Sequence, residues 1–187
     1  MFSIKILTKE TFFPLFEKFR PIVFEDTHSF TWRDVLPPKE LDQIEKLNEN
    51  MGKRFELHLG VFNEIDEFIG WCSGYQNSKD SFCMMNSGVL KEYQRQGIYS
   101  ALLQKNLEIL TEKGFQIIWS RHCATNNAVI IPKLRAGFII SSLEIDDCFG
   151  TLIQLRYYTN ASRRKIMDYR CGQRKPDKEL KEIFKIQ

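Results

Sequence analysis

The stretch VLKEYQRQGIYSALL, residues 89–103, passes from an apolar run through a polar turn into a second apolar run with a different period. Residues 82–90 are typical of a strand, whereas the apolar positions from Ile98 onward recur at helical spacing until Gly114. Such a turn leaves the first N–H groups of the helix unpaired, and the helix dipole favours an anion beside them. Residues 94–99 are therefore predicted to hold a phosphate, which Gly97 lets the backbone approach closely. A single glycine before a helix is more often only a tight turn, so the rest of the chain must support this interpretation.

The remaining apolar patterns place this turn within an α/β (α+β) fold. Alternating residues indicate strands, and longer periodic runs indicate helices. The predicted strands cover residues 2–7, 54–62, 67–75, 82–90, 115–120, 138–145 and 151–158, and the predicted helices cover 9–20, 39–51, 98–113 and 128–136. The strands at 82–90 and 115–120 are joined through a helix, so we expect them to lie parallel.

Length and composition fit one globular domain. The chain has 187 residues, 43% of them hydrophobic, and a formal net charge of +3, which is too small to indicate a nucleic-acid partner. No apolar run approaches the roughly 18 residues of a membrane span, and the start lacks the apolar core of a signal peptide. Five cysteines without CxxC spacing indicate reduced, mostly buried thiols rather than disulfides or a metal site, and hence a cytoplasmic protein.

The end of the chain differs from the rest in charge. Residues 159–187 hold 9 Lys and Arg against 4 Asp and Glu, whereas residues 1–158 are slightly acidic. We expect residues 1–158 to form the domain and residues 159–187 to form a basic helical extension that packs on it through apolar side chains. Nucleic-acid binding through this tail is an alternative, which retention on heparin would reveal.

Two motifs and the order of elements resemble the GNAT superfamily of acetyl-CoA-dependent N-acetyltransferases. The turn of that family reads Gln/Arg-x-x-Gly-x-Gly/Ala, and Gln94, Gly97 and Tyr99 occupy its three defined positions. A second motif, an Asn followed eleven residues later by Gly-Phe, is met by Asn126 and the pair at 137–138. The element order extends the likeness over residues 1–158. The resemblance implies a mixed central sheet of about seven strands with flanking helices, in which the parallel pair splays apart.

The resemblance also implies where acetyl-CoA, the co-substrate, would bind, and it implies no metal. The pyrophosphate would lie against residues 94–99 and the pantetheine arm between the parallel strands, where unpaired strand amides would bind it and polarise the thioester carbonyl. Gly88 is expected to mark a bulge that opens the strands. Helix N-capping is an alternative role for the two asparagines of the set. The predicted cofactor-binding residues are Val89, Leu90, Gln94, Arg95, Gln96, Gly97, Ile98, Tyr99, Ser100, Asn126 and Asn127.

Two positions depart from the family pattern. Tyr99 replaces a small residue at the start of the helix, although its backbone N–H stays available. Many family members place a tyrosine seven residues after the Asn to protonate the departing thiolate, and Lys133 stands there in this chain. We expect Lys133 to reach solvent or a cofactor phosphate, or to have no role. Pro132 is expected to kink the helix at 128–136 or to delay its start.

The candidates for moving protons are scattered along the chain. Glu25 and His28 lie in the loop that would wall the acceptor site, and His122 ends the strand after the cofactor helix. Tyr93 and Tyr99 are alternative acids. Each of these residues is more often structural than catalytic, and a dedicated base is not required, since proximity supplies much of the rate.

The implied function is transfer of an acetyl group from acetyl-CoA to a primary amine by direct attack on the thioester. The acceptor, a small molecule or a protein, is not defined by the sequence, and a homodimer is left open. The alternative is a non-catalytic acyl-CoA-binding sensor or interaction module, which the missing tyrosine favours. Release of free thiol in the presence of amines distinguishes the two.

Overall fold

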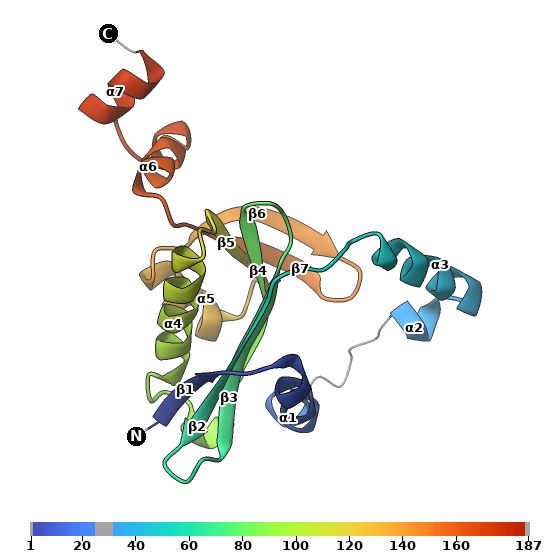
Figure 1. Cartoon of the computed structure of the whole chain (residues 1–187). Helices are drawn as coiled ribbons and strands as arrows, with labels where there is room; N and C mark the ends of the chain where they lie inside the picture. Colours follow the sequence, from blue (N-terminus) through green and yellow to red (C-terminus); the bar gives the residue numbers. More distant parts are fainter. Residues whose placement is uncertain (1, 25–31, 186–187) are drawn as a thin grey trace.

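The computed structural model describes residues 2–24 and 32–185, which form a seven-stranded mixed sheet with helices on both faces (Figure 1). The strands are β1 (Phe2–Ile6), β2 (Glu56–Asn63), β3 (Phe68–Gln76), β4 (Ser81–Val89), β5 (Ile117–Cys123), β6 (Ile139–Asp146) and β7 (Gly150–Tyr158). The helices are α1 (Lys9–Val23), α2 (Trp32–Val35), α3 (Pro38–Glu49), the 3-10 turn η1 (Lys91–Tyr93), α4 (Ile98–Glu112), α5 (Asn127–Arg135), α6 (Ala161–Arg170) and α7 (Lys178–Phe184). The strand order is β1-β2-β3-β4-β5-β7-β6, and only β4 and β5 are parallel. The predicted fold class and parallel pair are confirmed.

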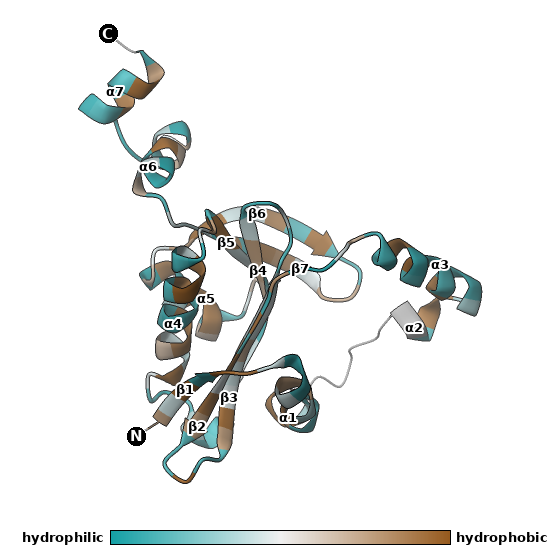
Figure 2. Cartoon of the chain, viewed as in Figure 1, coloured by the Kyte–Doolittle hydropathy of each residue, from teal (hydrophilic) through white to brown (hydrophobic). Residues whose placement is uncertain are grey.

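The sheet has an aliphatic core on one face and an aromatic core on the other. Along β2, Leu57, Leu59 and Val61 belong to the same buried cluster as the leucines of α4. The intervening side chains face α1, where Phe12 packs with Phe62 and with aromatic residues of β3. By contrast α3 buries no residue, and Figure 2 shows it largely hydrophilic. In the described part of the chain, none of the helices combines the length and the apolar character needed to cross a bilayer.

Two helices continue through a proline, although α1 was predicted to end at residue 20 and Pro132 was expected to kink α5 or delay its start. α1 runs past Pro21 to Val23, because the N–H of Phe24 still bonds to the carbonyl of Arg20 at 2.9 Å. α5 starts at Asn127 rather than late and contains Pro132. A proline removes only its own N–H from the helix ladder, so a helix can continue past it with the loss of that one bond.

The parallel strands β4 and β5 are paired over only three residues. Ser81, Phe82 and Cys83 pair with residues 117–119 of β5, and no pairing between the two strands follows. We call the paired part the closed end, and the unpaired segments, residues 84–89 of β4 and 120–123 of β5, the fork. Each strand keeps its outer neighbour throughout, β3 for β4 and β7 for β5. The predicted splaying of the pair is therefore present.

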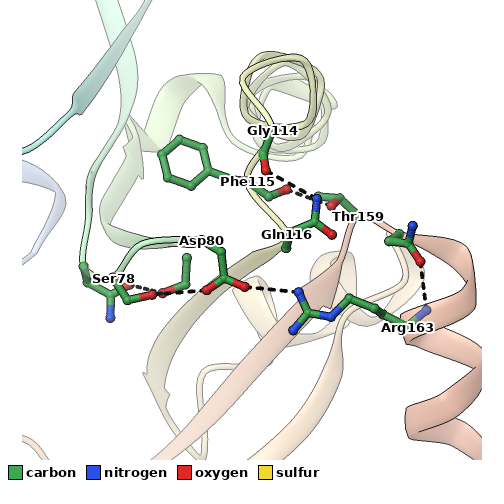
Figure 3. A network of polar contacts seen from close by, with 10 residues as sticks. Ser78, Asp80, Gly114, Phe115, Gln116, Thr159 and Arg163 are labelled. Carbon is green, nitrogen blue, oxygen red and sulfur yellow. Dashed lines mark hydrogen bonds and ion pairs between the residues drawn. The ribbon is translucent and has the colours of Figure 1, made fainter.

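Polar contacts lock the closed end (Figure 3). The backbone N–H groups of Gln116 and Ile117 both donate to the carbonyl of Asp80, at 2.9 and 3.2 Å. The Asp80 carboxylate accepts from the Arg163 guanidinium at 3.2 Å, and the Thr159 hydroxyl donates to the carbonyl of Phe115 at 2.7 Å. Residues from before β4, before β5 and after β7 thus meet at one point, which fixes the origin of the fork.

The bulge that reshapes β4 lies at Met85. Ser73 pairs with Asn86 and Gly74 pairs with Met84, so Met85 is the extra residue on its strand, and it is 56% exposed. The expectation that Gly88 marks the bulge is wrong. Gly88 lacks a side chain for a packing reason, since a Cβ there would lie 2.7 Å from the indole ring of Trp71.

The C-terminal extension is helical, as predicted, and extends beyond the sheet in Figure 1. Side chains cap both helices, since Asn160 accepts from the N–H of Arg163 in α6 and Asp177 accepts from the N–H of Leu180 in α7. Of the apolar side chains of the extension, Leu180 is fully buried, whereas Ile183 is 46% exposed.

Candidate active site

The turn before α4 forms a backbone cradle from residues 94–99. Arg95 and Gly97 both adopt left-handed conformations, with φ of +61° and +79°. Alternation of this kind turns consecutive N–H groups toward one side, and such a concavity binds anions. α4 then begins at Ile98 without a side-chain cap and without an acidic residue in its first turn. The cradle therefore offers unpaired donors and no competing negative charge to a phosphate group.

The glutamine side chains of this turn brace its backbone. Gln94 donates to the carbonyl of Val89 and Gln96 donates to the carbonyl of Glu92, both at 3.1 Å. Gln96 and Ile98 also line a cavity of about 330 Å³ beside the turn. Predicted residues 94–100 thus lie together at the end of β4.

The edge of β4 that faces the fork presents unpaired amides. The N–H of Leu90 bonds to the carbonyl of Ile69 in the neighbouring chain segment, on the β3 side. Because N–H groups alternate between the two edges of a strand, those of Val89 and Ser87 point away from β3, toward the fork. A peptide-like ligand lying in the fork can pair with both, as an added strand would.

Asn126 and Asn127 lie at the start of α5, where β5 ends. Asn126 is the N-cap residue, but its side chain makes no capping hydrogen bond with the helix, and both asparagines are exposed. The alternative role of side-chain capping is therefore not used by Asn126. Its amide is available to a ligand leaving the fork.

Lys133 is buried, with 1% of its surface exposed, and it does not reach solvent as expected. Its ammonium donates to the hydroxyl of Ser120 at 2.6 Å, lies 3.6 Å from the sulfur of Met84, and sits over the ring of Phe138 at 5.1 Å. Among the described residues it forms no ion pair with a carboxylate. Burial lowers the pKa of Lys133 to about 8, against the opposing influence of the thiols of Cys72 and Cys83.

His122 is connected to this lysine through Ser120. Its Nε2 lies 2.9 Å from the Ser120 hydroxyl, which also accepts from Lys133. Burial, and then the charge of Lys133, lowers the pKa of His122 to about 3. His122 is therefore a neutral imidazole and a weak base at physiological pH.

The tyrosine candidates are separated by the fold. Tyr99 lies against the aliphatic core, and burial raises the pKa of its phenol. Tyr93 instead accepts a hydrogen bond from the Asn63 amide at 3.1 Å, next to the β2–β3 turn. Glu25 and His28 lie outside the described residues.

The sequence interpretation missed Ser120 and Met84, which hold the ammonium of Lys133. Both are small or apolar residues inside strands, and neither belongs to a motif. One feature of the sequence could have indicated Ser120. It lies two residues after Ile118, on the buried side of β5, where a serine hydroxyl needs a hydrogen-bond partner.

Comparison with known proteins gives a consistent result. Residues 20–138 match the sequence profile of the acetyltransferase (GNAT) family. No curated protein matches the chain in a sequence search. The fold resembles the ribosomal-protein-S18-alanine N-acetyltransferase from Escherichia coli, with a TM-score of 0.63 and 20% identity over 86% of this chain and 95% of that one.

Two further solved structures share the fold at lower identity. One is yncA from Salmonella typhimurium with its cofactor acetyl-CoA, at a TM-score of 0.62, 13% identity, and coverage of 86% and 95%. The other is an N-acetyltransferase from Staphylococcus aureus Mu50, at 0.61, 14%, and coverage of 86% and 99%. The profile match spans more than half of the chain and includes the cradle, the fork and α5. The chain thus belongs to the GNAT family of acetyltransferases, whose acetyl donor is acetyl-CoA.

Proposed function

We propose that this acetyltransferase moves the acetyl group of acetyl-CoA to a primary amine, and that the amine attacks the thioester directly. One observation carries the proposal: the unpaired edge of β4 ends at the cradle. The amides of Ser87 and Val89 lie on the edge of β4 that leads to the cradle, and the cradle adds the N–H groups of residues 95–99, whereas the N–H of Gln94 bonds to the carbonyl of Lys91. A ligand with an amide-containing arm and a terminal pyrophosphate matches these donors in chemistry and in order.

The proposal assigns the parts of the coenzyme to three groups of residues. The cradle around Gly97 binds the pyrophosphate, and the N–H groups of Ser87 and Val89 bind the pantetheine amides or the thioester carbonyl. Asn126 or Asn127 binds the arm from the α5 side. Direct attack needs only a neutral amine near a polarised carbonyl, so proximity supplies most of the rate and His122 need not act as a base.

The proposal also places the enzyme in the cytoplasm. All five cysteines lie among the described residues and are free thiols, which suits a reducing compartment. Cys72 and Cys83 are buried as expected, but Cys123 and Cys171 are exposed. A homodimer stays a prediction.

The test combines binding with turnover. Acetyl-CoA at a hundredfold excess over its Kd should stabilise the protein by about 2.7 kcal/mol, seen as a higher Tm. Thiol release is then followed with panels of small amines, amino acids and peptides. The absence of a Tm shift at millimolar acetyl-CoA contradicts the proposal. A Tm shift without thiol release from any amine supports the sensor alternative instead.

A further inference from the structure

Strand β6 leaves one edge of the sheet open, and its sequence does not protect that edge. Of the two outermost strands, β1 has five residues and carries Lys5, whereas β6 has eight residues and contains no lysine, arginine or proline. Soluble proteins usually protect an open edge with a lysine, a proline or a very short strand, because its free N–H and C=O groups can pair with another chain. In the part of the chain that the structure describes, no strand pairs with the outer edge of β6. The edge is therefore suited to a further strand.

The same strand carries a row of exposed aliphatic side chains, which we call the aliphatic row. Ile140, Leu143 and Ile145 are 56%, 68% and 79% exposed. They lie opposite alternate residues of β7 between 151 and 155, so the bulge at Ser141 keeps all three on one face of the sheet. None of the three carries a charge or a polar group, and exposed apolar groups that gather in this way mark an interaction surface. The aliphatic row therefore fits an apolar partner and not a polyanion.

Helix α5 lies on the same face of the sheet as the aliphatic row. Leu155 of β7 lies opposite both Ile140 and Ser120, and Ser120 is hydrogen-bonded to α5. The helix adds Ile131 and Leu134, which are also exposed, to the apolar groups on this face. We call the outer edge of β6 and these five aliphatic side chains the β6 surface. A surface that combines an open strand edge with exposed aliphatic side chains is typical of a protein interface.

Opposite charges lie at the two ends of β6 and indicate the partner. Arg135, the last residue of α5, precedes the strand, and Asp147 follows it in the turn to β7. Both side chains are exposed, and neither forms an ion pair within the part of the chain that the structure describes. Two antiparallel copies of β6 would bring the start of one strand beside the end of the other, so Arg135 of each copy would lie near Asp147 of the other. This charge complementarity favours a second copy of the chain as the partner.

The side chains of β6 also select the register of that pairing. A two-fold axis at Glu144 would place two carboxylates directly opposite each other, which is unfavourable between neighbouring strands. An axis at Leu143 instead places Leu143 opposite its own copy, and it places Ser142 opposite Glu144. The axis is therefore expected at Leu143, in the middle of the aliphatic row.

We infer that two copies of this chain associate through the β6 surface, with their β6 strands paired antiparallel about a two-fold axis at Leu143. The pairing satisfies the open edge of each copy and joins the two seven-stranded sheets into one continuous sheet. The aliphatic rows of the two copies then lie side by side across the axis, and each contact is made twice. The β6 surface does not include the cradle or the fork, so the inference does not depend on the proposed acetyl transfer.

Sedimentation equilibrium of the full-length protein at micromolar concentration tests the association. The wild type should have twice the 22.1 kDa mass of one chain. Leu143→Lys should have the mass of one chain, because the substitution places two ammonium groups opposite each other across the axis. Leu47→Lys is the matched control and should stay dimeric, since Leu47 is 65% exposed on α3, far along the chain from β6. Circular dichroism verifies the fold, and Ile145→Lys serves the same comparison if Leu143→Lys does not fold.

Two results of this measurement would overturn the inference. A wild type with the mass of one chain would leave the β6 surface to a different partner. A variant Leu143→Lys that folds and keeps the dimeric mass would show that the two copies meet elsewhere.

Disulfide formation tests the position of the axis. Leu143→Cys should give a covalent dimer on mild oxidation, because residues paired across antiparallel strands have Cα atoms about 4.5–5.5 Å apart, within the range that a disulfide spans. The wild type and Leu47→Cys contain the same five native cysteines and should not be linked to the same extent. Equal linkage in Leu143→Cys and Leu47→Cys overturns the register.

Reversal of the terminal charges tests the antiparallel direction. Arg135→Asp and Asp147→Arg should each raise the dissociation constant of the dimer by about threefold or more, because each replaces an attraction by a repulsion in both symmetry-related contacts. The double variant should return the dissociation constant to the wild-type value, since opposite charges meet again. A double variant that dissociates more readily than either single variant overturns the antiparallel pairing.

Discussion

The two ends of the β4–β5 pair differ in whether the strands are paired. At the closed end, backbone pairing, the fully buried Phe82 and the contacts of Asp80 hold the strands together. In the fork the same strands run apart, and amides, a buried lysine and a buried serine replace the pairing. The contacts that stabilise the strand pair lie at the closed end, and the unpaired polar groups lie in the fork.

The difference shows how a sheet can carry a gap at its centre. Unpaired strand edges are costly when they are buried, so a fork is tolerated only where the strands are fixed elsewhere. Here β3 and β7 hold the outer edges of β4 and β5, and the closed end fixes their origin. We therefore expect substitutions at the closed end to lower the stability of the fold, and substitutions in the fork or the cradle to weaken ligand binding.

Phe82→Ala should produce the largest effect on stability. The ring of Phe82 is fully buried and packs against Phe55 and Phe115. Its removal should lower the free energy of unfolding by about 3–5 kcal/mol in urea denaturation. The folded fraction should still bind acetyl-CoA within about threefold of the wild-type Kd. A loss of acetyl-CoA binding with an unchanged free energy of unfolding would contradict the expected difference between the closed end and the fork.

Lys133→Met should stabilise the protein at neutral pH, by about 1–3 kcal/mol, because it removes a buried charge. The pKa of Lys133 falls from 10.5 to about 8 on folding, so the unfolded chain binds more protons between these values and wild-type stability rises with pH there. The advantage of the variant should therefore be full below pH 8 and shrink toward pH 10.5. Urea denaturation at several pH values measures it. A constant difference would show that packing, and not charge, separates the two proteins.

Gly97→Val and Gly114→Val separate backbone strain from ligand binding. Both glycines have positive φ, +79° and +90°, and at neither would a Cβ meet an atom within 4 Å. Each substitution should cost about 1–2 kcal/mol of stability through the left-handed backbone. Only Gly97→Val should also raise the Kd of acetyl-CoA, by about tenfold or more, because only Gly97 lies in the cradle. Equal affinities in the two folded variants would count against the cradle, and calorimetry can measure both.

Arg163→Met should have the smallest effect. Its ion pair with Asp80 is partly exposed, with 39% and 34% of the two side chains accessible, so its loss should cost less than about 1 kcal/mol. Affinity for acetyl-CoA should not change. A larger loss of stability would mean that the C-terminal extension holds the closed end more strongly than its exposure indicates.

The elements of the sheet could be predicted because each has a strong period or a clear stop. Every predicted strand exists, and α4 begins at the predicted Ile98. Helix ends were less certain, since the prolines within α1 and α5 remove one hydrogen bond each and do not end the helix. The cradle was predictable because it depends on the local backbone conformation, and a glycine at position 97 indicates the left-handed conformation that the structure has there.

The buried lysine could not be predicted, because α5 is oriented against its hydrophobic pattern. Ile130 and Lys133, one turn apart, are its buried residues, whereas Ile131 and Leu134 are 45% and 39% exposed. A periodic pattern alone places the aliphatic side chains inward and the lysine outward. The position of Met85 was equally hidden, since a bulge depends on the register with β3 and leaves no mark in the composition of β4.

Arg164 of α6 donates to the carbonyl of Gly137, the residue at which α5 turns into β6, and also bonds to Asp168 at 2.9 Å. The family profile ends at Phe138, one residue later. Arg164 lies beyond the residues that the profile matches, yet its guanidinium holds the turn between α5 and β6. Removal of the extension would therefore leave the carbonyl of Gly137 without this donor, so the tail and the end of α5 are coupled in structure.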